Sequence, residues 1–317
     1  ILRRLRERGT SIVYISHYLK EVFEISDRIV VLRDGLNAGE FDPATADVSD
    51  VVNAMLGRVA GSLFEDRDPP PGEAETVFSC CNLRHPPQID SVTFDLKAGE
   101  ILGVFGLIGS GVEVLGRLIF GAEGAPSGGE ITLFGAGYTP SSPIHGKEAG
   151  LGFLTAEHKT EGIIAEMSVS ENLVAAFQTD FGKGPRTDRA QEAAHTRAWI
   201  EKLGIKTAGP DQQIRFLSGG NQQKVCLARW LNPKVRMLIL EEPTRGVDVG
   251  ARRDIYRQLV ELARGGLAIL VLSSDVEEVA GLSDRSLVIQ RGRIVAEFGS
   301  AATSADLMSA SAATISN

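Results

Sequence analysis

Cysteine and long basic runs are both scarce in this sequence. The three cysteines, Cys80, Cys81 and Cys226, are too few and too unevenly spaced for a disulfide framework or a four-ligand zinc site, so we interpret them as packing residues. The 33 Lys and Arg are outnumbered by 41 Asp and Glu, which gives a net charge of -8. This balance argues against a nucleic-acid partner, and the low cysteine content is typical of a reducing compartment.

Long apolar runs without charges are also lacking. The most apolar stretch, residues 101–122, contains Glu113 and Arg117, and its glycines cluster at a turn. This pattern indicates a buried strand, a loop and a helix rather than a membrane span. With 43% hydrophobic and 23% charged residues, the chain can bury one large core or two smaller ones. It opens at Ile1 inside a helical pattern, so we expect its N-terminus to be cut.

One segment of the sequence occurs twice. Residues 11–41 (SIVYISHYLKEVFEISDRIVVLRDGLNAGEF) align without gaps with residues 268–298 (AILVLSSDVEEVAGLSDRSLVIQRGRIVAEF), at a shift of 257 (283 − 26). Each copy predicts an apolar strand, a short amphipathic helix ending at Ser-Asp-Arg, a second strand, and a Gly-centred turn into a third. About 200 residues precede the second copy but only about ten precede the first, so we expect the body of a first domain upstream of Ile1.

The composition between the two copies suggests where the domains meet. Residues 57–75 (GRVAGSLFEDRDPPPGEAE) are rich in glycine, proline and acid and have no apolar period, which is typical of a linker. We expect a remnant of a first domain over residues 1–57, a linker over 58–75 and a second domain over 76–298. Residues 299–317 then form a tail, either frayed or with a short helix around 305–310.

Residues 101–120 predict a strand, a glycine loop and a helix. The loop reads GLIGSGVE and contains Gly106, Gly109, Ser110, Gly111, Val112 and Glu113. Glycines before a helix expose backbone N–H groups that can hold phosphate. The usual pattern continues with Lys, which neutralises phosphates, and Ser or Thr, which binds magnesium. Here Val112 and Glu113 hold those positions, so the loop alone is a weak signal and a tight structural turn is the competing interpretation.

Two further motifs follow in a fixed order. Residues 217–231 (LSGGNQQKVCLARWL) predict a helix that begins after Ser218, Gly219, Gly220 and Asn221, which form a second candidate anion site. A buried strand at residues 237–240 then ends in the paired carboxylates Glu241 and Glu242. Such a pair can hold magnesium and position a water molecule.

With these motifs the sequence resembles the ABC ATPases, and more closely the tandem-lobe ATP-binding subunits of bacterial sugar importers of the ribose, galactose and xylose type. The specific part is LSGGNQQK together with EPTRGVDVGAR (residues 242–252), and the resemblance covers residues 1 to about 298. It implies that residues 106–113 are the Walker A loop, 156–157 the Q-loop and 217–222 the signature. It also implies roles for single residues: Walker B acid for Glu241, catalytic glutamate for Glu242, D-loop for Asp248, and first-lobe switch histidine for His17.

The sequence departs from this family pattern at one site. The Walker A lysine is Val112, the magnesium hydroxyl is Glu113, the Walker B aspartate is Glu241, the Q-loop glutamine is lost at Ala156-Glu157, and the second switch histidine is Ser274. We therefore expect the second lobe's own site to be impaired. The resemblance implies head-to-tail pairing of lobes, so His17, the signature and Asp248 would serve one intact composite site. The alternative to a catalytic role is that His17 is a solvated or capping residue.

The resemblance implies an α/β fold: a P-loop ABC ATPase lobe with a mainly parallel sheet, an antiparallel β portion and a helical subdomain. It implies ATP hydrolysis with Mg2+ for solute import at the cytoplasmic face of the bacterial inner membrane. The implied partners are two transmembrane permease subunits, a periplasmic solute-binding protein indirectly, and a second ATPase lobe, without nucleic acid. A non-catalytic nucleotide-binding regulatory or interaction module is the alternative. ABC proteins of DNA repair or the ribosome fit less well, because coiled-coil insertions, CxxC pairs and a basic surface are not visible.

Overall fold

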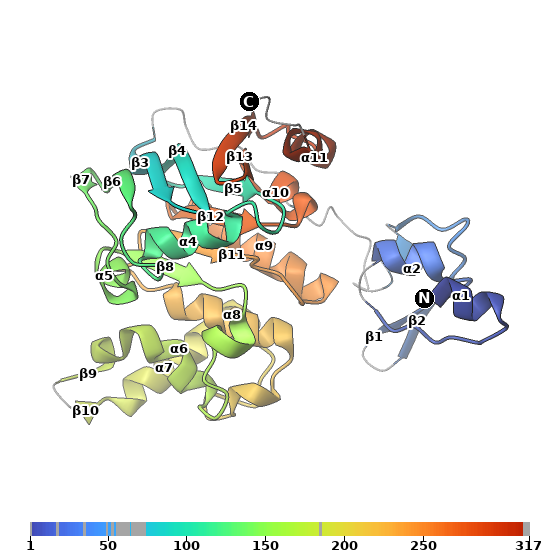
Figure 1. Ribbon diagram of the computed structural model, residues 1–317. Helices are drawn as coiled ribbons and strands as arrows, with labels where there is room; N and C mark the ends of the chain where they lie inside the picture. The colour runs from blue at the N-terminus through green and yellow to red at the C-terminus, as the bar shows by residue number, and fades with distance from the viewer. Residues whose placement is uncertain are drawn as a thin grey trace. The chain divides into compact units, whose positions relative to one another are not determined.

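The computed structural model of the protein describes residues 2–16, 19–33, 36–48, 50, 51, 54, 64, 74–183 and 186–312. His17 and most of the predicted linker lie outside the described residues. The chain divides into two compact units: residues 1–64 with 247–254, and residues 65–246 with 255–317. Figure 1 shows the elements of both units. In the described part of the chain, every helix is too short or too polar to span a membrane.

The first unit contains the helix–strand–strand part of the repeat. Its elements are α1 (Leu2–Glu7), α2 (Leu19–Ile25), β1 (Ile29–Arg33) and β2 (Leu36–Phe41), and the two strands pair antiparallel. A small core forms from Val22, Ile29, Val31 and Val51. The strand predicted at residues 11–16 is not formed, and Val13 and Ile15 there are 90% and 92% exposed. That prediction is wrong for this chain because an apolar strand is held by its neighbours, and this segment has no strand paired with it among the described residues.

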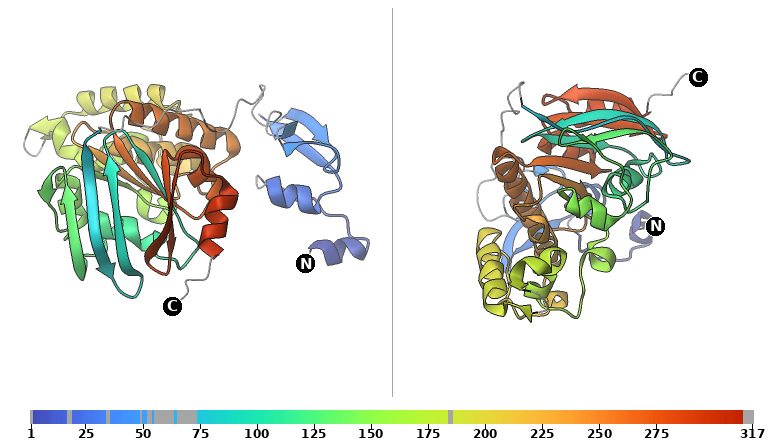
Figure 2. Two further views of the ribbon diagram at one scale, coloured as in Figure 1. Left: turned by 90° about the horizontal axis from the view of Figure 1, so that it is seen from above. Right: turned by 90° about the vertical axis from the view of Figure 1, so that its left-hand side faces the viewer.

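The second unit is built on a ten-stranded sheet in the order β7-β6-β3-β4-β14-β13-β5-β12-β11-β8. The parallel part consists of β5 (Ile101–Phe105), β8 (Leu151–Leu154), β11 (Met237–Glu241), β12 (Ala268–Ser273) and β13 (Arg285–Gln290). The antiparallel part consists of β3 (Thr76–His85), β4 (Ile89–Lys97), β6 (Gly128–Leu133) and β7 (Ala136–Gly137). The last strand, β14 (Arg293–Gly299), pairs antiparallel with β13 and meets β4 at Ser91, so the two ends of the unit's sequence lie side by side (Figure 2). The predicted α/β fold with an antiparallel portion is confirmed.

Helices cover both faces of the parallel strands. Successive side chains of a strand point to opposite faces, so a strand that is apolar throughout needs packing partners on both sides. On β5, Leu102 and Val104 join the core on the side of α4 (Val112–Phe120). Phe105 instead packs with Val279 of α10 (Val276–Leu282) and Leu307 of α11 (Ser304–Ala312). The predicted tail thus forms its short-helix alternative over the described residues, since Leu307 is fully buried.

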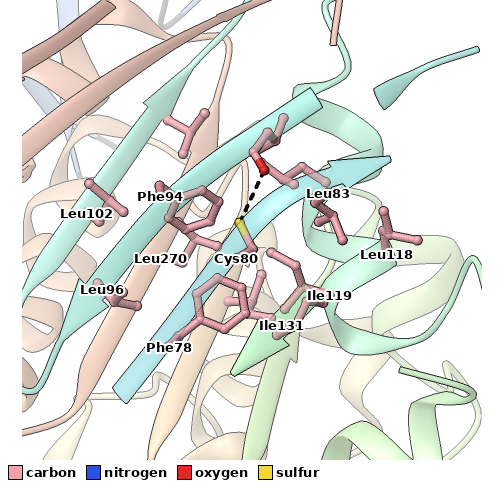
Figure 3. Packing of buried hydrophobic residues seen from close by; sticks show 14 of the residues in the cluster. Phe78, Cys80, Leu83, Phe94, Leu96, Leu102, Leu118, Ile119, Ile131 and Leu270 are labelled. Atoms are coloured by element: carbon pink, nitrogen blue, oxygen red, sulfur yellow. Dashed lines mark hydrogen bonds between the residues drawn. The ribbon is translucent and has the colours of Figure 1, made fainter. Parts of the chain in front are cut away.

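Of the three cysteines predicted to be packing residues, two are buried and one is not. Figure 3 shows Phe78 and Cys80 of β3 and Ile131 of β6 beside Leu118 and Ile119 of α4. Burial raises the pKa of the Cys80 thiol to about 12, and Cys226 is likewise buried. Cys81 is exposed, so its predicted packing role is wrong. It follows Cys80 on the same strand and therefore points to the opposite face.

The predicted helical subdomain forms between β8 and β11. It contains α6 (Val169–Val174), α7 (Arg189–Lys202) and α8 (Gly219–Trp230), with the short helices η2 (Ala175–Phe181) and η3 (Ile214–Phe216) and the strands β9 (Gly182–Lys183) and β10 (Arg186–Thr187). Leu203 and Val225 lie in its core and Trp199 packs against it. The first turn of α6 is closed by a capping box between Ser168 and Glu171. The remaining helices of the unit are α5 (Pro143–Glu148), the π-helix η1 (His158–Gly162) and most of α9 (Val249–Arg264).

Candidate functional site

The candidate site lies where four neighbouring parallel strands end. β5, β12, β11 and β8 run in one direction, so the residues that follow them meet at one edge of the sheet. The Gly106 N–H donates to the Ser273 carbonyl at 3.3 Å, and the Glu242 N–H donates to the Leu272 carbonyl at 2.9 Å. These bonds bring together the glycine loop, the paired carboxylates and the predicted switch position.

The glycine loop, residues 106–111, forms the predicted turn between β5 and α4. Gly109 and Gly111 have φ values of 84 and 102, which side chains rarely adopt. A Cβ on Gly111 would also lie 2.5 Å from the Gln88 carbonyl oxygen. Ser110 is buried, and its carbonyl accepts the Gly292 N–H at 2.7 Å. The loop is therefore fixed by contacts to its own unit, and its glycines are required by the backbone.

The two residues after the loop differ from each other in their surroundings. Val112 is 5% exposed and belongs to the hydrophobic core on the α4 side. Glu113 is exposed, and its Oε1 accepts the Gly109 N–H at 2.7 Å. At the positions of the family's lysine and hydroxyl, the loop thus has a buried apolar side chain and a carboxylate bonded to the loop itself.

Glu241 ends the buried strand β11 and is 4% exposed. Burial raises the pKa of Glu241 to about 8, while nearby Arg117 acts in the opposite direction. Arg117 of α4 lies with Nη1 3.8 Å from Glu241 Oε2 and 2.9 Å from Glu161 Oε2, and with Nε 3.3 Å from Glu123 Oε1. The hydrogen bond to Glu161 raises the pKa of Arg117, so the guanidinium is held in its charged form.

Glu242 is bound by hydroxyl and amide groups of the next strand end. Its Oε1 accepts from the Ser274 N–H at 2.8 Å and from the Ser274 hydroxyl at 2.7 Å, and its Oε2 lies 3.1 Å from Ser273 Oγ. Ser273 Oγ also lies 2.6 Å from the buried carboxyl of Glu278. The backbone of Glu242 is left-handed, with φ 43, which is unusual outside glycine. Ser274, at the switch position, therefore holds Glu242 rather than leaving it free.

The predicted Q-loop follows β8. Glu157 is exposed, and its Oε1 accepts from Arg245 Nη1 at 2.8 Å. Thr155 Oγ1 donates to Glu161 Oε2 at 2.8 Å, so the same segment reaches Arg117 through Glu161. Between these carboxylates, His158 is buried, and burial lowers its pKa. The segment is thereby tied to both α4 and residues after β11.

The predicted signature lies at the start of α8. Ser218 is exposed and is the residue before the helix, and its Oγ accepts from Asn221 Nδ2 at 2.7 Å. Asn221 Oδ1 accepts the Lys206 N–H at 2.8 Å. Gly219 and Gly220 open the helix, and a Cβ on Gly219 would lie 3.7 Å from the carbonyl oxygen of Gly246. Asp248 belongs to the first unit, where its Oδ1 accepts the Ala251 N–H at 3.0 Å.

Sequence reasoning missed four charged residues of this site: Arg117, Glu161, Arg245 and Glu278. Arg117 carried a signal, because it is one of two charges in the apolar stretch of residues 101–122. The other three sit in ordinary polar surroundings in the sequence. Their roles become visible only when strands far apart in the sequence end at one edge.

The residues at this edge do not fit a magnesium ion as the family places it. Magnesium requires oxygen ligands at about 2.0–2.1 Å in octahedral geometry and usually keeps several waters. Glu113 is bonded to Gly109, Glu157 to Arg245, and Glu241 lies beside Arg117. Over the described residues, no group of three or more His, Cys, Asp and Glu side chains is placed so that it could hold a metal ion.

Comparison with known proteins identifies the fold and the domain that it contains. The chain resembles a nucleotide-free ATP-binding cassette from an ABC transporter (TM-score 0.60, 21% identity, 71% of this chain and 92% of that chain). It also resembles the ADP conformation of the cassette MJ1267 (TM-score 0.59, 23% identity, 72% and 92%). Residues 89–245 match the family model of the ABC transporter. The fold is that of an ABC ATPase cassette, and residues 89–245 form an ABC transporter domain.

More specific similarity is to proteins of sugar import. The chain is 40% identical over 299 residues to the ribose import ATP-binding protein RbsA 2 of Burkholderia pseudomallei (strain 1710b), covering 94% of this chain and 58% of that protein. It is 39% identical over 297 residues to the ribose import ATP-binding protein RbsA of Bacillus subtilis (strain 168), covering 94% and 60%. The chain thus spans less than two thirds of the length of these relatives.

Proposed function

We propose that this chain is part of the ATP-binding subunit of a bacterial ABC importer for a sugar. The similarity to ribose import ATP-binding proteins supports this, together with the LSGGNQQK and EPTRGVDVGAR runs. In this proposal ATP and Mg2+ bind between two lobes of the full-length subunit. The subunit works at the cytoplasmic face of the inner membrane with two transmembrane permease subunits, and a periplasmic solute-binding protein delivers the solute.

Two observations support the proposed tandem-lobe organisation, with a first-lobe remnant at residues 1–57, a linker at 58–75, a second lobe at 76–298 and a tail at 299–317. Arg28 pairs with Glu40 at 2.7 Å in the first unit, and the corresponding Arg285 pairs with Glu297 at 2.8 Å in the second. An open hollow of about 820 Å³ in the first unit is lined by residues 11–16 and by β1. A lobe body upstream would fill this hollow and cover the exposed Val13 and Ile15.

The starts of helices α8 and α4 differ in how many of the family's motif residues they keep, and this difference supports our assignment of a working and a degenerate site. At α8 the signature residues Ser218, Gly219, Gly220 and Asn221 are intact, and Ser218 is exposed. At α4 the position of the phosphate-binding lysine is Val112, which is buried in the core. We therefore propose one working site in the full-length subunit, completed by this signature, Asp248 and His17. The second lobe's own site is degenerate, although Glu241 and Glu242 remain at the Walker B and catalytic positions.

ATP hydrolysis by the full-length protein tests the working site. Ser218→Arg places a long cation at the N-terminus of α8, and we expect turnover to fall by about 100-fold, the size of a lost transition-state contact. The control is Ser300→Arg, which adds the same charge at an exposed turn outside the motifs. Undiminished turnover in Ser218→Arg would show that this signature serves no working site.

Equilibrium binding of labelled ATP to the 317-residue chain tests the degenerate site. We expect no binding by the unmodified chain and measurable binding by Val112→Lys, Glu113→Thr, because the repaired loop regains a cation and loses a repelling carboxylate. Tight, magnesium-dependent binding by the unmodified chain would refute the degenerate site. A full-length protein that binds ATP without hydrolysing it would instead favour the non-catalytic regulatory module.

A further inference from the structure

The glycine loop carries an anion of its own. The carboxylate of Glu113 turns back from the first turn of α4 and accepts the Gly109 N–H at 2.7 Å. Backbone N–H groups at a helix N-terminus carry partial positive charge and are the groups that hold phosphate in such loops. One of these donors is therefore already bonded to a negatively charged oxygen of the same chain.

The Walker B position has a cation of its own. Glu241 is 4% exposed, and its Oε1 has no hydrogen-bond partner within the described part of the chain. Arg117 supplies a positive charge beside Glu241, with its Nη1 3.8 Å from Glu241 Oε2. Arg117 is oriented by Glu161, which accepts from Nη1 at 2.9 Å and from Nη2 at 3.4 Å. Burial favours the protonated form of Glu241, and the positive charge of Arg117 acts against this shift because a guanidinium remains charged at every physiological pH.

We propose that the second lobe's nucleotide site is self-occupied, with Glu113 as the resident anion of the glycine loop and Arg117 as the resident cation beside Glu241. The inference rests on the proposed function, which names this edge as a nucleotide site. It goes further because it explains how a site without ligand keeps its shape. Glu113 satisfies the loop amide, and Arg117 joins α4 to the end of β11 and, through Glu161, to the segment after β8.

This arrangement makes a distinct prediction for the repaired loop. Val112→Lys, Glu113→Thr removes the resident anion but leaves Arg117 beside Glu241. We therefore expect that variant to bind ATP with similar affinity in the presence of Mg2+ and of a chelator, with less than about a threefold difference. A tenfold or larger gain on adding Mg2+, equivalent to about 1.4 kcal/mol, would show that Arg117 does not hold the cation position.

The resident anion is tested with inorganic pyrophosphate as the probe, by calorimetry on the 317-residue chain. We expect Glu113→Ala to bind pyrophosphate at least about tenfold more tightly than the unmodified chain, because the Gly109 N–H becomes available. Glu113→Gln is the matched variant: its amide oxygen can still accept from Gly109, so its affinity should stay near that of the unmodified chain. Glu130→Ala, which removes an exposed carboxylate from β6, should change nothing.

Each result of the pyrophosphate experiment decides the point. If Glu113→Gln gains as much affinity as Glu113→Ala, the negative charge alone excludes pyrophosphate. The proposal that Glu113 blocks the Gly109 N–H would then be wrong. If Glu113→Ala gains nothing, or the unmodified chain binds equally well, Glu113 is not the resident anion. These outcomes leave the proposed function standing, because that proposal is judged by hydrolysis in Ser218→Arg.

The resident cation is tested by urea unfolding with Mn2+ as the probe, followed by the fluorescence of Trp199 and Trp230. We expect Mn2+ to leave the midpoint of the unmodified chain unchanged. Arg117→Met should lower the midpoint, and Mn2+ should restore part of the loss because the carboxylates of Glu241 and Glu161 lack their cation. Arg117→Lys keeps a positive charge and should respond little to Mn2+, so it remains informative if the methionine variant does not fold. A response to Mn2+ by the unmodified chain or by Arg117→Lys would overturn the assignment.

Discussion

The two copies of the repeat differ most at their first strand. In the second unit, β12 lies between β5 and β11, and all of its residues are buried. In the first unit, residues 11–16 form no strand, and Val13 is 90% exposed where its counterpart Leu270 is fully buried. A strand of this apolar kind forms its hydrogen bonds with other strands, so its sequence specifies a partner as well as a conformation.

The rest of the repeat is nearly the same in both units. β1 pairs with β2 as β13 pairs with β14, and the register shifts at Val31/Leu32 in one copy and at the corresponding Val288/Ile289 in the other. The pair Arg28–Glu40 recurs as Arg285–Glu297. The register shift and the ion pair are local, and so they form with or without neighbouring strands.

The largest expected effect on stability comes from truncating an apolar side chain in β12, compared with the same change in the corresponding residues 11–16. Leu270→Ala should destabilise the second unit by about 2–5 kcal/mol, because it leaves a cavity between buried strands. Val13→Ala should change the stability of the first unit of this chain by less than about 0.5 kcal/mol. Urea unfolding followed by tryptophan fluorescence reports the first change, and hydrogen exchange of residues 19–41 reports the second. Equal losses of stability in the two variants would contradict the difference between β12 and residues 11–16. A large loss for Val13→Ala that appears only in the full-length protein would support an upstream lobe.

A smaller effect is expected from the repeated arginine. Arg285 also donates to Glu100, whose side chain is 4% exposed, at 2.8 Å. Arg285→Met leaves that carboxylate buried without its cation and should destabilise the second unit by on the order of 3 kcal/mol. Arg28→Met breaks an exposed pair and should change stability by less than about 1 kcal/mol. Equal losses in thermal unfolding of the two variants would show that the additional partners of Arg285, Glu100 and Asp95, contribute nothing.

The carboxylates Glu278 and Glu21 occupy the same place in the repeat. Glu278 is buried and accepts from the hydroxyls of Ser273, Thr244 and Tyr256 at 2.6, 2.6 and 3.0 Å. Glu278→Gln replaces one of the two acceptor oxygens by an NH2 group that faces a hydroxyl donor, and should destabilise the second unit by about 1–3 kcal/mol in urea unfolding. An unchanged urea midpoint would contradict this role for Glu278.

The smallest expected effect concerns the first copy of this carboxylate. The hydrogen bond that the Tyr14 hydroxyl donates to Glu21 at 2.6 Å raises the pKa of Tyr14. In Glu21→Gln the pKa of Tyr14 should fall back toward 10, since the negative acceptor that opposes ionisation is removed. Ultraviolet titration of tyrosine ionisation measures the shift, with Glu40→Gln as a control that keeps Glu21. An unchanged titration curve would mean that Glu21 does not bind Tyr14.

Much of the fold and part of the site follow from local sequence. The glycine loop before α4, the start of α8 after Ser218 and the buried β11 ending in Glu241 were predicted, because each depends on a short run of residues. The strand at residues 11–16 and the packing role of Cys81 were predicted wrongly. In the first case the partner strands decide the outcome, and in the second the pleat of β3 does. The roles assigned to Glu242, Asp248, His17 and the signature residues stay predictions.

The sequence by itself determined the order of the elements, the repeat and the ABC transporter domain, because apolar period, glycine positions and motif spacing are local properties. Only the tertiary structure decided how the charges of the site are neutralised. Arg117 meets Glu161 and Glu241 because α4, the segment after β8 and the end of β11 converge at one edge of the sheet. Electrostatic energy depends on distance and on exposure to water, and folding sets both only when segments far apart in the sequence pack together.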